Sequence, residues 1–430
     1  MPGFLGIRGT GSWTNEERPK NWREGILYLY PNGSAPLTGL LSKLPEEKVD
    51  DPEYHWWTKI LASQGGEVTA VYTDAGLSVP YVSGGVAGSV LYLKMAETIA
   101  DEFHAGHQAL LRDASHLDVD VNAKVLSVVK QGANSYISAR LLEADDNGAS
   151  TDLSNCDTIM VNGNMNPENG PMQESISYDA TKWTNYTQIF RNSLELSRTA
   201  MLTRLRTKSA YAEAKRETLE YHSIEMEKAF LFGIATENTG ANGLPERTTM
   251  GLIPAIKAGA PTNVSDYTLD TTYSGDSWLT SGEEWLDSKL EVIFRYGARE
   301  KMAFIGSGGV LGINRLAKSS GQIQLMPMTV AYGLKVMQWI TPFGVLYLMI
   351  HPLFSFDATT RNAAVIFEPA MLRYKYVTDT MFKGCDQNKV SSAQESYDGI
   401  KEEWLTECGL EYHHPVKFGF LSGIGNNNVV

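Results

Sequence analysis

Residues 184–232 read TNYTQIFRNSLELSRTAMLTRLRTKSAYAEAKRETLEYHSIEMEKAFLF and carry the strongest structural signal in the chain. The stretch contains no Gly or Pro, is rich in Leu, Ala, Glu, Lys and Arg, and stops at Gly233. Such residues favour helix, and a glycine commonly ends one. The composition therefore predicts one long helix over 184–232.

This predicted helix has an incomplete heptad pattern. Apolar residues recur every seventh position, at Leu205, Ala212, Leu219 and Met226. A coiled coil needs further apolar residues three positions along, but those positions hold Lys208, Lys215 and His222. We therefore expect a single helix that lies on the surface of its own domain.

The sequence before this helix has the pattern of β-strands. The β-rich runs are VTAVY at 68–72, VLYLKM at 90–95, DVDVNAKVLSVVK at 118–130 and YISARLLEAD at 136–145. Alternation in the third run is typical of a half-buried antiparallel strand, and KQGANS at 130–135 is typical of a hairpin turn. The region is predicted to be a β-rich module or a long hairpin, followed by a polar connector at 151–171.

Residues 1–62 are predicted to form an irregular arm. Prolines interrupt the segment, and its aromatic residues lack a periodic apolar partner set; these aromatics are Trp13, Trp22, Tyr28, Tyr30, Trp56 and Trp57. Large aromatics without such partners are poorly placed to bury themselves within one segment. We expect them to pack on a different subunit, the alternative being a strap over the chain's own core.

After the long helix and a loop at 235–249, short helices and strands alternate. Helices are predicted at 283–297 and 308–320, and strands at 301–306 and, as a pair turned at Pro342–Gly344, at 334–351. Residues 361–377 and 402–424 return to a β pattern. The whole is predicted to be α+β, with one dominant helix and strands from distant parts of the chain.

Composition excludes several classes of protein. A chain of 430 residues with 43% hydrophobic residues can bury a sizeable core, which excludes global disorder. A net charge of -13 argues against binding nucleic acid through phosphate contacts. The cysteines Cys156, Cys385 and Cys408 are scattered and odd in number, which predicts reduced thiols and no disulfide framework. Neither a signal peptide nor a membrane-spanning run is evident.

A glycine-rich turn at 301–317 suggests nucleotide binding, but its details argue against that site. After Gly306 and Gly308 the third glycine position holds Leu311, and no Asp or Glu occurs from Lys301 to Phe356. A dinucleotide fingerprint needs both that glycine and an acid for the ribose. A P-loop motif is also missing.

No other constellation reaches the specificity of an active site. His104 and His107, with Asp101, Glu102 and His116 nearby, could bind a divalent ion, but polar turn histidines are the simpler interpretation. Adjacent His413 and His414 would point to opposite faces of a strand. The acid pairs Glu283–Glu284 and Glu402–Glu403 are expected on solvated helical faces. The sequence predicts no enzyme, no catalytic, cofactor-binding or metal site, and no cofactor.

The order of these parts resembles the major capsid proteins of tailed bacteriophages. The resemblance covers nearly the whole chain, including REGILYLYPNGSAPLTGLL and DPEYHWW in the arm, GHQALLRDAS, TKWTNYTQIFRNSLELSRTA, EMEKAFLFG, REKMAFIGSGGVLGINRLA, YGLKVMQWITPFGVLYLMIHPLF and WLTECGLEYHHPVKFGFL. It implies the Hong Kong 97 fold, with an N-terminal arm, an extended β-hairpin loop region, a spine helix on an antiparallel sheet and a compact α/β axial domain.

The resemblance also implies a division of the chain. The expected parts are an arm at 1–62, a β-rich extended-loop region and connector at 63–183, a peripheral domain with the spine helix at 184–249, an axial domain at 250–355 and returning strands at 356–430. The acid-free stretch from Lys301 to Phe356 is expected near a capsomer axis, because carboxylates of several copies would repel there. Arg315, Lys318 and Lys335 are expected at its surface.

The implied function is a self-assembling shell of hexamers and pentamers, icosahedral or prolate, that encloses double-stranded DNA. Portal and possibly scaffolding or decoration proteins are expected partners, and an uncleaved chain made in the host bacterial cytoplasm is expected to enter the virion. Basic residues interleave with acids at 198–220, so we expect no sequence-specific DNA contact and no membrane association. The alternatives are an encapsulin-like compartment and, less consistent with the residues, a carbohydrate-active enzyme.

Overall fold

The computed structural model describes residues 36–42, 44–61, 63–145, 152–170, 172, 175–203, 209–320, 325–331, 334–384 and 399–430. The chain divides into two compact units. One unit comprises Trp57–Lys182, and the other comprises the residues before and after it. No described helix is long and apolar enough to span a bilayer. The predicted α+β class is confirmed.

The unit of residues 57–182 is a closed six-stranded barrel. Its strands, in barrel order, are β3 (Gly65–Tyr72), β4 (Val90–Met95), β7 (Tyr136–Leu141), β6 (His116–Val129), β5 (His107–Asp113) and β8 (Thr158–Asn164). A short helix, α2 (Glu97–Ala100), follows β4. Alternating apolar residues such as Leu91 and Leu93 of β4 fill the interior. Of the two alternatives left open by the sequence, the β-rich module is correct.

The barrel contains two strands that the sequence analysis did not identify. Residues 151–171 were expected to be a connector, but β8 lies within them and pairs with both β3 and β5. Strand β5 begins at His107, within the segment interpreted as a polar turn. Both strands carry too few alternating apolar residues to be recognised alone, and barrel closure supplies their partners on both sides.

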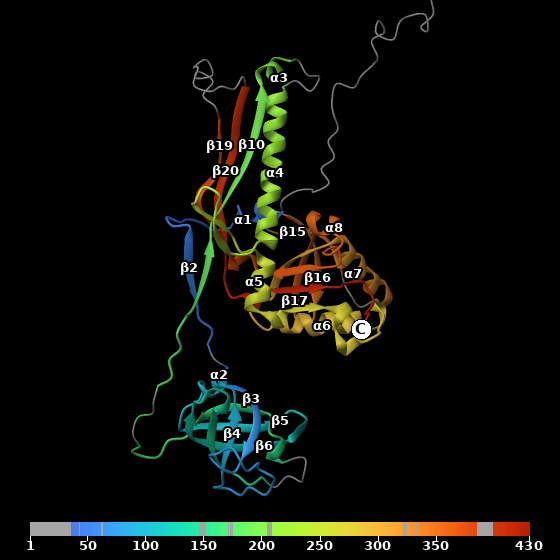
Figure 1. The fold of residues 1–430 in the computed structure, drawn as a ribbon. Helices are drawn as coiled ribbons and strands as arrows, with labels where there is room; N and C mark the ends of the chain where they lie inside the picture. The colour runs from blue at the N-terminus through green and yellow to red at the C-terminus, as the bar shows by residue number, and fades with distance from the viewer. Residues whose placement is uncertain are drawn as a thin grey trace, which may run out of the picture. The chain divides into compact units, whose positions relative to one another are not determined.

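The second unit contains a four-stranded sheet beside the longest helix, α4 (Ala210–Phe232) (Figure 1). The strand order is β1 (Glu46–Lys48), β19 (Leu372–Lys383), β20 (Gly399–Tyr412) and β10 (Gln188–Ser197). β1 runs parallel to β19, whereas the longer strands are antiparallel. Helix α4 buries residues near its C-terminal end, including Ile224, Phe230 and Leu231.

The prediction of a single helix over 184–232 is wrong for its first part. Strand β10 pairs residue by residue with β20 from Gln188 to Ser197, and a short helix, α3 (Arg198–Leu202), follows it. Phe190 and Leu194 are buried while their neighbours are exposed, as in a half-buried strand. Thr, Asn and Ser weaken helix propensity here, and ladder bonds to a strand two hundred residues away decide the outcome. The predicted end at Phe232–Gly233 is confirmed.

The rest of the second unit is a mixed α/β lobe. Its seven-stranded sheet has the order β13 (Val264–Asp266), β21 (Gly419–Ser422), β18 (Ala364–Phe367), β14 (Glu300–Ile305), β17 (Gly344–Ile350), β16 (Leu334–Thr341) and β15 (Leu325–Ala331). The helices are α5 (Leu252–Gly259), α6 (Trp278–Phe294), α7 (Ser307–Ser320) and α8 (Pro352–Phe356). The predicted helices at 283–297 and 308–320, the strand at 301–306 and the strand pair at 334–351 are confirmed.

Smaller elements complete the described chain. Helix α1 (Pro36–Leu41) lies in the predicted arm. β2 (Glu53–Thr58) pairs with β9 (Thr181–Tyr186), and the predicted loop at 235–249 contains the hairpin of β11 (Thr236–Thr239) and β12 (Pro245–Thr248). The five-part division at residues 62, 183, 249 and 355 stays a prediction.

Candidate functional site

The histidine pair of the barrel unit has the geometry of a packed turn. The rings of His104 and His107 have centroids 3.6 Å apart, and the His104 backbone amide donates to Nδ1 of His107 at 3.3 Å. Burial, together with the neighbouring His104, lowers the pKa of His107. Asp101 pairs with Lys130 at 2.6 Å. Among the described residues, no three His, Cys, Asp or Glu side chains are grouped to hold a metal.

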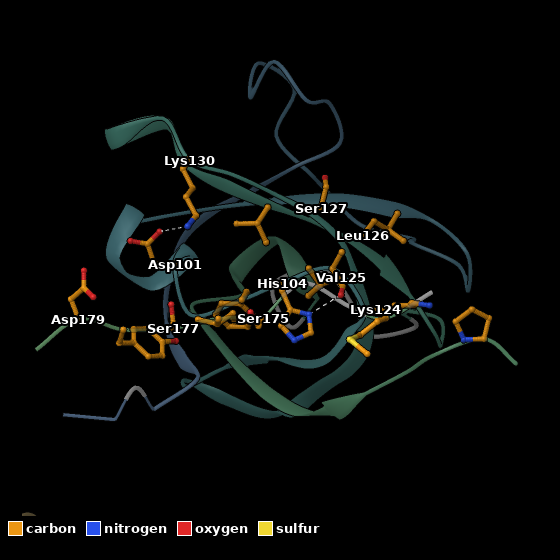
Figure 2. A pocket seen from close by; sticks show the side chains of 18 residues that line it. Asp101, His104, Lys124, Val125, Leu126, Ser127, Lys130, Ser175, Ser177 and Asp179 are labelled. Atoms are coloured by element: carbon orange, nitrogen blue, oxygen red, sulfur yellow. Dashed lines mark hydrogen bonds and ion pairs between the residues drawn. The ribbon is translucent and has the colours of Figure 1, made fainter. Parts of the chain in front are cut away.

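A cavity of about 1060 Å³ opens beside His104 (Figure 2). The Asp101–Lys130 ion pair and the Ser127 side chain line this cavity. Ser127 Oγ is 2.6 Å from Ser138 Oγ, and within the described chain it does not hydrogen-bond to His104. The cavity thus offers polar contacts without a paired nucleophile and base.

The two acid pairs have different environments. Glu283 and Glu284 lie on α6 as predicted. Glu402 and Glu403 lie on β20, so their predicted helical location is wrong. Glu403 pairs with Arg191 at 2.6 Å, while Glu402 is buried. β20 is paired on both sides, and alternate residues of a strand face opposite sides of the sheet, which separates the two carboxylates.

The glycine-rich turn between β14 and α7 serves close packing. A Cβ on Gly306 would collide with the Arg361 backbone, and one on Gly308 would lie 2.5 Å from Oδ1 of Asn362. The strand–turn–helix order that suggested a nucleotide site is present. The two glycines, however, allow a neighbouring loop of the same chain to pack closely against the turn.

The described cysteines are structural. Cys156 and Cys408 are free thiols and both are buried. Burial raises the pKa of each thiol to about 12. A thiol with so high a pKa is a poor nucleophile at neutral pH. Cys385 lies outside the described residues.

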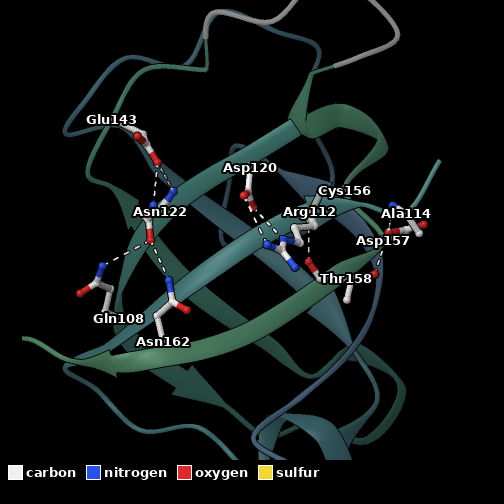
Figure 3. Close-up of polar contacts among 10 residues, drawn as sticks. All are labelled: Gln108, Arg112, Ala114, Asp120, Asn122, Glu143, Cys156, Asp157, Thr158 and Asn162. Atoms are coloured by element: carbon white, nitrogen blue, oxygen red, sulfur yellow. Dashed lines mark hydrogen bonds and ion pairs between the residues drawn. The ribbon is translucent and has the colours of Figure 1, made fainter. Parts of the chain in front are cut away.

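A polar surface crosses three strands of the barrel (Figure 3). Asn122 Oδ1 accepts hydrogen bonds from Gln108 Nε2 at 3.3 Å and from Asn162 Nδ2 at 3.1 Å. Beside them Arg112 Nε donates to Asp120 Oδ1 at 2.7 Å, and both side chains are about half exposed. These groups satisfy one another, which suits a solvated surface better than a reaction centre.

The second unit contains a buried polar anchor that the sequence analysis did not identify. Glu227 of α4 accepts hydrogen bonds from the backbone amides of Leu37 and Thr38, each at 2.7 Å. His351 Nε2, at the start of α8, lies 2.8 Å from Glu227 Oε1. The carboxylate thus joins the first turn of α1 to α4 and α8. The available sequence signal was an acid between Met226 and Phe230, on the apolar side of the helix.

Two aromatic side chains of the predicted arm pack on their own chain. Tyr54 and Trp56 are buried, Tyr54 Oη donates to the Leu410 carbonyl at 3.0 Å, and the Trp56 ring meets the Tyr412 ring edge-on at 5.1 Å. The prediction that arm aromatics bury against another subunit is therefore wrong for Trp56. Alternation on β2 directs Tyr54 and Trp56 to the core and leaves Trp57 exposed. Trp13, Trp22, Tyr28 and Tyr30 lie outside the described residues.

Over nearly its whole length the chain is similar to proteins described as major capsid proteins. A family model described as SU10 major capsid protein matches residues 8–425. The major capsid protein of Pseudomonas phage PaMx41 is 24% identical over 448 residues, which cover 99% of this chain and 97% of that protein.

Two solved structures are similar at lower levels. One is from Mycobacterium phage Bobi, with 10% identity, a TM-score of 0.44 and coverage of 95% of this chain and 96% of that chain. The other is the SrpI encapsulin complex of Synechococcus elongatus, with 10% identity, a TM-score of 0.40 and coverage of 57% and 78%. These scores are too low to establish a shared fold, whereas the family match spans nearly the whole chain.

Proposed function

This chain belongs to the SU10 major capsid protein family, and we propose that its copies assemble as hexamers and pentamers into an icosahedral or prolate head shell around double-stranded DNA. It is a major capsid protein of a phage and so a component of the virion. The observation that carries the proposal is the match of the family model to residues 8–425. The long helix beside an antiparallel sheet and the α/β lobe fit the Hong Kong 97 architecture that the resemblance implied.

We further propose that the chain has no catalytic role and needs no cofactor. The histidine pair, the acid pairs, the glycine turn and the buried thiols each have a structural explanation in the described residues. Synthesis in the host cytoplasm, and contacts with portal, scaffolding or decoration proteins, complete the proposal.

We propose that DNA is held by confinement. Lys215 of α4 directs its ammonium over the Phe382 ring at 3.5 Å, and Arg216 pairs with Glu220, one helical turn further on, at 3.7 Å. Both cations are thus engaged within the chain. Arg204, Arg206 and Lys208 lie outside the described residues.

Electron microscopy of the purified full-length protein tests the assembly, and the nucleic-acid content of particles isolated from infected cells tests the cargo. We expect closed shells, filled with double-stranded DNA in the virion. Small closed particles that enclose a protein cargo would instead support the encapsulin alternative. Failure to form any closed particle would contradict the proposal.

A further inference from the structure

Helix α6 has one side that the described part of the chain leaves at least partly open to solvent. Its other face buries Trp278, Trp285 and Leu290 in the core of the lobe. Toward the solvent side, Leu279, Glu283 and Asp287 follow one another at four-residue intervals; Leu279 is 54% exposed, whereas Glu283 and Asp287 are half-buried. Residues at this spacing lie along one side of a helix. We call Leu279, Glu283 and Asp287 the acidic stripe.

Helix α7 has a second solvent-facing side, of opposite charge, that no described residue covers. Ile313 and Leu316 are buried, whereas Leu311 is 49% exposed and both Arg315 and Lys318 are exposed. We call Leu311, Arg315 and Lys318 the basic stripe. It lies in the segment from Lys301 to Phe356, which contains no Asp or Glu. The predicted exposure of Arg315 and Lys318 is confirmed, and the Lys335 side chain lies outside what the structure describes.

The charges of the two stripes are not neutralised within the described part of the chain. None of the four charged residues of the stripes forms an ion pair with another described residue, although neighbours such as Lys289 and Arg295 do. Burial, together with the like charge of Glu283, raises the pKa of Asp287. An opposing cation would relieve this repulsion.

The spacings of the two stripes match. With a rise of about 1.5 Å per residue, the charged positions lie about 6 and 12 Å from Leu279 and about 6 and 10 Å from Leu311. In a parallel alignment the two leucines meet, Glu283 faces Arg315 and Asp287 faces Lys318. The alignment pairs apolar with apolar and acid with base throughout.

We propose that the acidic stripe of one copy docks on the basic stripe of a second copy, in a parallel alignment of α6 with the neighbour's α7. The contact joins two different surfaces, so it is heterologous, and repetition by rotation closes a ring. This inference rests on the proposed shell function and supplies the contact between neighbouring copies in a capsomer. Complementary charge would also steer copies toward the correct register.

Charge reversal tests the pairing in the full-length chain. We expect Arg315→Glu and Asp287→Arg each to slow particle formation by about tenfold or more, because electrostatic steering commonly acts on that scale. Combining both changes should bring the rate back toward that of the unmodified protein. Lys228→Glu, an exposed site on α4, is the matched control and should assemble normally. Circular dichroism verifies folding of each variant.

A cross-link tests the geometry independently of rate. In a chain with its native cysteines replaced by Ser, Leu279→Cys and Leu311→Cys introduced together should give a ladder of covalent oligomers on oxidation. Either substitution alone should give no ladder. Normal particles from both charge-reversed singles, no recovery in the double variant, or no ladder would overturn the inference while leaving the shell function intact. A protein that never assembles would contradict both.

Discussion

Glu227 Oε1 and His351 Nε2 lie 2.8 Å apart, and both side chains are completely buried. His351 Nδ1 accepts a hydrogen bond from the Leu353 amide at 3.2 Å, so Nε2 carries the hydrogen donated to Glu227. Every hydrogen-bond partner of the Glu227 carboxylate among the described residues is therefore a donor: the amides of Leu37 and Thr38, the Thr38 hydroxyl and His351.

From this arrangement we predict that Glu227→Gln strongly destabilises the unassembled subunit. In either orientation the new side-chain amide turns its NH₂ group toward two donors. The free energy of unfolding should therefore fall by about 3 kcal/mol. Urea unfolding measures it. Glu220→Gln on the same helix removes only the surface pair with Arg216 and should cost less than about 1 kcal/mol. Equal losses of unfolding free energy in the two variants would contradict the role of Glu227 as a buried polar anchor.

Adjacent tryptophans on β2 should behave differently. Trp56 is 5% exposed and packs on Tyr412, so Trp56→Ala should cost about 3–5 kcal/mol of folding free energy. Trp57 is 61% exposed, and Trp57→Ala should change stability by no more than about 0.5 kcal/mol. Thermal or urea unfolding of both variants provides the comparison. A small loss of folding free energy in Trp56→Ala would instead support the original prediction that these aromatics pack on another subunit.

Lys301 should make the free energy of unfolding depend on pH in the alkaline range. Its Nζ donates to the carbonyls of Tyr296 and Lys417 at 3.0 and 2.9 Å, and burial lowers its pKa from 10.5 to about 8. Between these two values the unfolded chain binds more protons than the folded one, so this group makes the protein more stable as pH rises. Unfolding free energies measured at several pH values from 7.5 to 10 should rise less in Lys301→Met than in the unmodified protein. Parallel pH profiles would contradict this.

The buried thiols should resist alkylation in the native state. Because burial raises the pKa of Cys156 and Cys408 to about 12, little thiolate exists at neutral pH and access is restricted. Mass spectrometry after brief iodoacetamide treatment should find both unmodified in the folded protein and modified in urea. Rapid native labelling of either one would show that its surroundings open readily.

Duplex DNA should bind purified capsomers weakly. A chain with a net charge of -13, whose Lys215 and Arg216 are engaged internally, can neutralise few phosphates. We expect dissociation constants weaker than about 1 μM at physiological salt, with no sequence preference. Fluorescence anisotropy over a salt series measures this. Tight, salt-resistant binding would mean that the chain has a dedicated DNA surface.

The sequence by itself determined the elements that local pattern specifies. The alternation in 118–130, the strand and helix around Gly306 and the helix end at Gly233 follow from propensity and periodicity, and the order of these parts led to the correct family. Local pattern could not reveal that Gln188–Ser197 is a strand, because its ladder partner lies at Gly399–Cys408. For the same reason, local pattern could not predict that β5 and β8 complete the barrel.

Only the tertiary structure decided the roles of single polar residues. The sequence cannot distinguish the buried Glu227 and Glu402 from the exposed Glu284, since burial depends on which distant elements pack over a side chain. Likewise, α6 and α7 were both predicted, but which of their faces remain free became known only once the lobe's core was in place. Long-range packing sets the environment of each charge, and that environment determines whether it anchors the fold or is available to a neighbour.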